Sequence, residues 1–89
     1  MVKLTRKVQI KNTLGLHARP ATTIVKLLQT VSSSVSFTHR KETVNAKSIM
    51  SILMLAAGKN AVITICVEGD DAEEAMEKIV DAFENRFGE

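Results

Sequence analysis

The chain has 89 residues, of which 45% are hydrophobic and 25% are charged. That length supplies the apolar residues of one small core, so residues 1–89 are expected to form a single domain. Cys66 is the only cysteine, which excludes disulfide scaffolds and Cys-rich zinc sites and fits a reducing cytoplasm. No apolar run is long enough to span a membrane, so we expect a cytoplasmic protein without membrane insertion.

Charge is distributed unevenly along the chain, although the net charge is only +2. Residues 1–67 carry ten of the twelve Lys and Arg residues and one acid, whereas residues 68–89 carry nine acids and two bases. A basic surface can bind nucleic acid, anionic lipid or an acidic protein. Because Trp and Tyr are absent and the three Phe do not interleave with basic residues, no nucleic-acid partner is expected. An acidic protein or a phosphate is favoured instead.

The first element predicted is a strand over Leu4–Ile10, where apolar and polar residues alternate. The segment from Asn12 to Gly15 breaks this alternation and predicts a turn. From Ala21 onward apolar residues follow the i, i+3, i+4, i+7 spacing of a helix, and the fixed φ of Pro20 suits a first helical turn.

A hairpin and a short helix are predicted next. Alternation on both sides of a polar link at His39–Glu42 predicts two short strands, with His39 interpreted as a solvated loop residue. Ser48 is the predicted N-cap of a helix over Ile49–Ala57, which Gly58 should end.

The β-branched run Val62–Val67 predicts a central strand, with Cys66 as a packing or open-face residue. Asp71 should then cap a last amphipathic helix, with Glu74 completing a capping box. The acids from Glu68 to Glu89 are interpreted as the solvated face and N-terminal charge of that helix. The element order β-α-β-β-α-β-α predicts an α+β fold, in which helices cover one side of a mostly antiparallel sheet.

The segment Gly15–Ala21, GLHARPA, is the strongest candidate for chemistry. It places His17 where a turn ends and a helix begins, so that helix amides could hold an anion over the imidazole. Arg19 adds a planar set of donors suited to phosphoryl oxygens. A histidine near an arginine, taken alone, is more often a residue that only caps a helix.

The full string GLHARPA resembles the active-site motif of the HPr family, the histidine-containing phosphocarriers of the phosphoenolpyruvate-dependent sugar phosphotransferase system. The resemblance extends over nearly the whole chain, including the segment Lys47–Met50 that opens the second helix. It implies an open-faced β-sandwich of four antiparallel strands with three helices on one face. It also implies that His17 accepts a phosphoryl group on Nδ1, and that Arg19 stabilises the group during transfer.

The same resemblance implies the partners. Enzyme I would donate the phosphoryl group and enzyme II A components would receive it, with the carrier acting as a monomer. Ser48 matches the serine that HPr kinase/phosphorylase modifies in many relatives of the Gram-positive type, which makes it a candidate regulatory site. No cofactor is expected, and the chain is interpreted as a covalent carrier rather than a self-sufficient enzyme.

The second predicted helix also points to a docking surface, because Ile49–Ala57 has almost no polar face and cannot be wholly buried in so small a domain. Its methionines suit an adaptable contact. Lys26 and Lys47 are expected to rim this patch and to steer it toward acidic surfaces. The predicted partner-binding residues are Ala18, Lys26, Lys47, Ile49, Met50, Leu53 and Met54.

The same residues also support an alternative function. Ser51, Leu53 and Met54 make the patch more apolar than expected of carbohydrate-transport members and resemble the nitrogen-related branch. On that interpretation the domain is a regulatory binding module that controls partners through Ile49–Ala57. The presence of His17 argues against the catabolite-repression paralogue, and His17 and His39 offer no metal-ligand spacing.

Overall fold

The computed structural model describes all of residues 1–89, and its elements follow the predicted order. They are β1 (Val2–Gln9), α1 (Ala18–Leu28), β2 (Ser34–His39), β3 (Glu42–Asn45), α2 (Ile49–Met54), β4 (Val62–Gly69), α3 (Ala72–Glu84) and a final 3-10 turn, η1 (Arg86–Gly88). None of these helices is long and apolar enough to cross a membrane.

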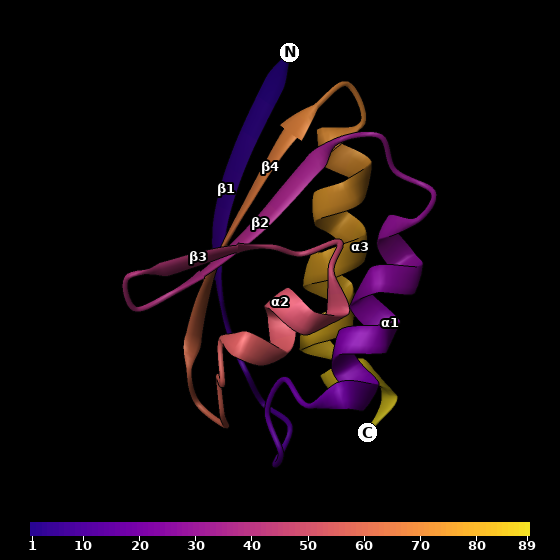
Figure 1. The fold of residues 1–89 in the computed structure, drawn as a ribbon. Coiled ribbons are helices and arrows are strands. Elements are labelled where there is room, and N and C mark those ends of the chain that lie inside the picture. The colour runs from indigo at the N-terminus through magenta and orange to yellow at the C-terminus, as the bar shows by residue number, and fades with distance from the viewer.

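The strands form one antiparallel sheet in the order β1-β4-β2-β3. Figure 1 shows the helices gathered on one face of this sheet, with the other face left uncovered. The predicted open-faced β-sandwich is therefore confirmed, and β4 is a central strand as expected. The uncovered face is polar and includes the half-exposed Cys66.

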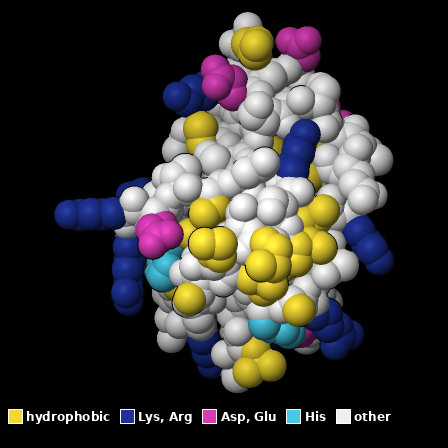
Figure 2. Space-filling model, viewed as in Figure 1, with side chains coloured by type: hydrophobic (Ala, Val, Ile, Leu, Met, Phe, Trp, Pro, Cys, Tyr) yellow, Lys and Arg dark blue, Asp and Glu magenta, His cyan; other side chains and the backbone are white.

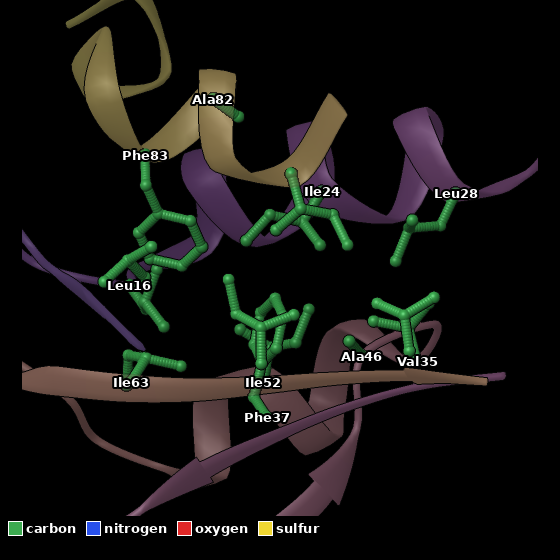
Figure 3. Close-up of a cluster of buried hydrophobic side chains, with 14 of the residues drawn as sticks. Leu16, Ile24, Leu28, Val35, Phe37, Ala46, Ile52, Ile63, Ala82 and Phe83 are labelled. Carbon is green, nitrogen blue, oxygen red and sulfur yellow. The ribbon is translucent and has the colours of Figure 1, made fainter. Parts of the chain in front are cut away.

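The core lies between the sheet and the helices. Phe37, Ile63 and Ile65 point inward from β2 and β4 and are wholly buried. Figure 3 shows such strand side chains meeting Ile24, Leu28 and Phe83 from α1 and α3. The apolar residues that recur every second position in the strands and every 3.6 positions in the helices thus face the same interior.

Helix α1 forms despite its run of β-branched residues. The hydroxyls of Thr22 and Thr23 donate to the carbonyls of Ala18 and Arg19, at 2.8 and 3.1 Å, so both polar groups find their partners within the helix. Pro20 lies in the first turn, where its missing N–H costs no hydrogen bond.

Helix α2 is shorter than predicted, since it ends at Met54 rather than Ala57. Ala56, not Gly58, takes the left-handed conformation that ends the helix, with φ of 50°. The carbonyl of Ala57 accepts a hydrogen bond from the Leu16 amide at 2.9 Å, so the residues after α2 pack against the β1–α1 loop. The general preference for glycine just after a helix therefore did not decide where α2 ends.

The start of α3 also differs from the prediction, because the Asp71 side chain does not cap its own helix. One carboxylate oxygen accepts from the Ser32 amide at 2.8 Å, and the other accepts from the Ser33 amide at 2.9 Å and from the Ser33 hydroxyl. The hydroxyl of Ser33, with the two amides, lowers the pKa of Asp71 from 3.8 to about 2. Asp71 therefore joins the loop after α1 to the start of α3.

This pKa shift makes the stability of the fold depend on pH. Because the folded-state pKa of Asp71 is depressed, its contribution is fully present above the unfolded pKa of 3.8 and is lost as pH falls toward 2. We expect Asp71→Asn to melt below the wild type at pH 7, and the difference in Tm to shrink as the pH approaches 2. Asp70→Asn, at the exposed neighbouring position, serves as the control. A gap in Tm that is the same at every pH would contradict this role.

Candidate functional site

The β1–α1 loop, residues 10–17, is fixed at both ends by the α2–β4 loop. The Ile10 amide donates to the Ala61 carbonyl and the Leu16 amide donates to the Ala57 carbonyl, each at 2.9 Å. The side chains of Ile10 and Leu16 are both buried in the core. The start of α1 is therefore held in place by contacts on both sides of the loop.

His17 is the N-cap residue of α1, as predicted, with an extended backbone and no capping hydrogen bond from its side chain. Its carbonyl accepts the first helical hydrogen bond, from the Ala21 amide at 3.0 Å. Because Pro20 has no N–H, the amides of Ala18 and Arg19 are the donors left free at this helix end. Ala18 and Arg19 are exposed, so these donors and the guanidinium stand beside an imidazole that is 32% exposed.

Glu89 completes the site on its other side. Its Oε2 lies 2.9 Å from Nε2 of His17, in a close contact that is not aligned as a hydrogen bond. Oε1 accepts from Nδ2 of the buried Asn12 at 3.1 Å, and the same Nδ2 donates to the Gly15 carbonyl at 2.7 Å. The Nε2 atom is thereby buried. One nitrogen of the candidate histidine is thus covered by a carboxylate.

The C-terminal residues reach His17 through a tight turn. Arg86 and Phe87 adopt φ of 57° and 55°, and the Phe87 ring is buried against Phe83 with centroids 4.9 Å apart. Figure 1 shows the C-terminus beside the first turn of α1. The interpretation of the acidic tail as a solvated face is wrong for Glu89, whereas Glu84 stays 58% exposed in a surface ion pair with Lys11 at 2.7 Å. No local pattern connects these acids with the GLHARPA segment, so sequence reasoning missed them.

Ser48 caps α2 as predicted, since its hydroxyl accepts from the Ser51 amide at 3.3 Å. Beyond this cap, Met50 and Met54 are 68% and 71% exposed, and Ile49 is also exposed. Figure 2 shows hydrophobic side chains gathered over α2, with a histidine bordering the cluster. Leu53 differs from the predicted set because it is half-buried and packs against the core.

The two lysines expected at the rim of this surface differ in whether their side chains are bound within the chain. Lys26 is exposed on α1. Lys47 donates from Nζ to the Val31 carbonyl at 2.9 Å, so its ammonium group joins the loop after α1 to the start of α2. A structural role of Lys47 therefore accompanies the steering role that the sequence predicts for it.

His39 is not the solvated loop residue that was expected. It is the last residue of β2, it is half-buried, and its Nδ1 lies 3.4 Å from the Leu55 carbonyl. Its imidazole thus lies next to the residue that follows α2, away from Asn12 and Glu89 beside His17. No group of three or more His, Cys, Asp or Glu side chains is arranged to hold a metal ion.

Comparison with known proteins connects this geometry with one family. Residues 4–85 match the family model described as the PTS HPr component phosphorylation site. The phosphocarrier protein HPr of Chlamydia muridarum is 46% identical over 80 residues, which cover 90% of this chain and 77% of that protein. A crystal structure of HPr-C-His from Thermoanaerobacter tengcongensis superposes with a TM-score of 0.90, at 43% identity, over 100% of this chain and 98% of that chain. The phosphocarrier protein HPr of Bacillus anthracis gives a TM-score of 0.87 at 38% identity, over 93% and 99% of the two chains.

Gly15 lies where the β1–α1 loop comes closest to the backbone of the α2–β4 loop. Its φ is +67°, and a Cβ there would lie 2.3 Å from the Ala57 carbonyl oxygen and 2.6 Å from the Cα of Gly58. We expect Gly15→Ala to lower the free energy of unfolding by roughly 2 kcal/mol, because backbone must move to admit the methyl group. Gly58→Ala is the matched control, since a Cβ at Gly58 meets nothing within 4 Å. Urea denaturation measures both, and equal losses would show that the close approach is unimportant.

Proposed function

Because the chain belongs to the HPr family of the phosphotransferase system, we propose that it carries a phosphoryl group on Nδ1 of His17. The burial of Nε2 against Glu89 is the observation that carries this proposal. With Nε2 covered, Nδ1 is the ring nitrogen left to attack phosphorus. The bond between the donor and phosphorus breaks as the bond between Nδ1 and phosphorus forms, in line.

The surrounding groups suit the charges of this step. Free amides of Ala18 and Arg19 and the positive end of α1 favour the oxygens of the incoming group. The Arg19 guanidinium supplies further donors with the planar geometry that phosphoryl oxygens accept. A ring that is bonded to phosphorus at Nδ1 and protonated at Nε2 carries a positive charge, which the Glu89 carboxylate at 2.9 Å can balance.

As a carrier the domain needs proteins that donate and receive the group, and the family implies enzyme I and enzyme II components in these roles. We infer that both bind the surface formed by Ala18, Lys26, Ile49, Met50 and Met54 beside His17. The exposure of Met50 and Met54 supports this, since large apolar side chains left in water gain most from being covered. The 23 buried hydrophobic residues form one cluster, which supports the proposal that residues 1–89 act as one domain. From the family we further propose that this domain is monomeric and cytoplasmic.

Phosphorylation of His17 can be tested directly. Incubation with enzyme I and phosphoenolpyruvate should add one phosphate, labile in acid and stable in base, and intact-mass measurement should detect it. His17→Ala should abolish the modification because the nucleophile is absent, whereas His39→Ala should retain it. Retention of the phosphate by His17→Ala would contradict the assignment. A wild-type protein that binds partners through α2 without being phosphorylated would instead support the regulatory binding module.

Ser48 is proposed as a regulatory phosphorylation site, with HPr kinase/phosphorylase as the partner. Its hydroxyl lies at the start of α2, next to the exposed Ile49 and Met50. A phosphoserine would add nearly two negative charges to a surface that is proposed to meet acidic partners. The helix N-terminus tolerates such charge, so the effect should fall on docking rather than on folding.

Ser48→Asp and Ser48→Ala separate the two roles of this residue. Ser48→Asp keeps an acceptor at the N-cap, so its Tm should stay near that of the wild type while phosphotransfer from enzyme I slows. Ser48→Ala should lose about 1 kcal/mol of stability with the cap but keep normal phosphotransfer. Equal phosphotransfer rates in the two variants would leave Ser48 as a helix cap alone.

A further inference from the structure

Leu14 is an exposed hydrophobic residue that the proposed docking surface does not include. It lies in the β1–α1 loop and is 71% exposed, as much as Met54 on α2. In Figure 2 a separate hydrophobic surface lies at the lower end of the molecule, in the region of this loop, with a histidine between it and the cluster over α2. We propose that Leu14 is a second docking point for the phosphoryl-donating enzyme, which therefore contacts hydrophobic groups on two sides of His17. This inference rests on the proposed function.

The loop presents Leu14 in a fixed conformation. The Gly15 amide donates to the Asn12 carbonyl at 3.2 Å, and the Asn12 side chain donates to the Gly15 carbonyl at 2.7 Å, so the turn is closed twice. Asn12 is itself buried. A residue at the tip of such a turn loses little conformational freedom when a partner covers it, which favours binding.

The exposure of Leu14 is not a consequence of a poorly packed loop. The neighbouring Ile10 and Leu16 fill the core and are 0% and 4% exposed. Ile10 and Leu16 are therefore the residues by which this loop contributes to the core, and the Leu14 side chain points away from the core. A leucine at this place contributes nothing visible to folding, whereas it extends the apolar surface next to His17.

The charges near Leu14 indicate what kind of surface would cover it. Leu14 lines a hollow with four cationic side chains and one carboxylate, namely Lys11, Arg19, Lys59, Arg86 and Glu89. Lys11 is paired with Glu84, and Glu89 faces His17. Arg19, Lys59 and Arg86 have no ion-pair partner within the chain. These charges therefore fit a partner protein with a hydrophobic pocket bordered by Asp and Glu side chains.

Steady-state phosphorylation by enzyme I and phosphoenolpyruvate, at varied concentrations of the carrier, tests this docking point. Leu14→Asn keeps a residue that suits turns but removes the apolar contact, so KM should rise about tenfold with kcat little changed. Leu14→Met should stay close to the wild type because it keeps an apolar side chain. The matched control is Val2→Asn, since Val2 is 43% exposed at the far end of β1. An unchanged KM for Leu14→Asn would overturn the proposal.

A small phosphoryl donor separates docking from chemistry. Phosphoramidate needs no protein surface, so it should phosphorylate the wild type and Leu14→Asn at equal rates. If neither phosphoramidate nor enzyme I modifies the wild type, the proposed function itself fails. A wild type that sediments as a dimer, with Leu14→Asn as a monomer, would assign Leu14 to self-association and overturn the proposal.

The wild-type protein provides a readout that does not depend on the folding of any variant. With selectively labelled leucine methyl groups, titration with enzyme I should shift or broaden the Leu14 signals, whereas the signals of the buried Leu28 should change least. In a second sample with labelled methionine methyl groups, the exposed methionines on α2 report on enzyme I binding at the proposed docking surface. Leu14 signals that stay constant while these methionine signals change would also overturn the proposal.

Discussion

The site depends on the contact between the β1–α1 loop and the α2–β4 loop. The hydrogen bond from the Leu16 amide to the Ala57 carbonyl, at 2.9 Å, fixes the chain immediately before His17. Gly15 makes this approach possible because any Cβ there would collide with the backbone of Ala57 and Gly58. The same bond holds the residues after α2 against this loop. One contact therefore fixes the position of His17 relative to the end of α2.

A carrier of this kind must expose its reactive nitrogen while keeping the rest of the ring in place. Here the exposed side is formed by the start of α1, whose free amides favour an anion. The covered side is formed by Glu89, which Asn12 holds through one carboxylate oxygen and which faces Nε2 through the other. The burial of Phe87 against Phe83 anchors the turn that brings Glu89 there. Packing in the core is thus coupled to the orientation of the imidazole.

The surface around His17 shows how a small domain separates folding from binding. Ile52 and Leu55 of the α2 region turn into the core, while Met50 and Met54 stay in water. The β1–α1 loop shows the same division, since Leu16 is buried and Leu14 is exposed. Several of the exposed apolar residues, on α2 and in the β1–α1 loop, flank the candidate histidine, and the unpaired Arg19, Lys59 and Arg86 lie near Leu14. Under the proposed function, unpaired cations in this place would speed the approach of a protein with an acidic surface.

Local patterns in the sequence determined the element order, the buried faces of the strands and helices, and the position of His17 at a helix start. Each of these follows from periodicity or turn chemistry within a few residues, as in the alternation of β4 or the Pro20 that opens α1. Only the tertiary structure decided that Glu89 meets His17, that Asp71 binds Ser32 and Ser33 instead of capping α3, and that Lys47 binds the Val31 carbonyl. It also decided that α2 ends at Met54 and that His39 lies half-buried at the end of β2. These contacts join residues that are far apart in the chain, and their partners are chosen by the packing of the helices on the sheet, which no local pattern of residues contains.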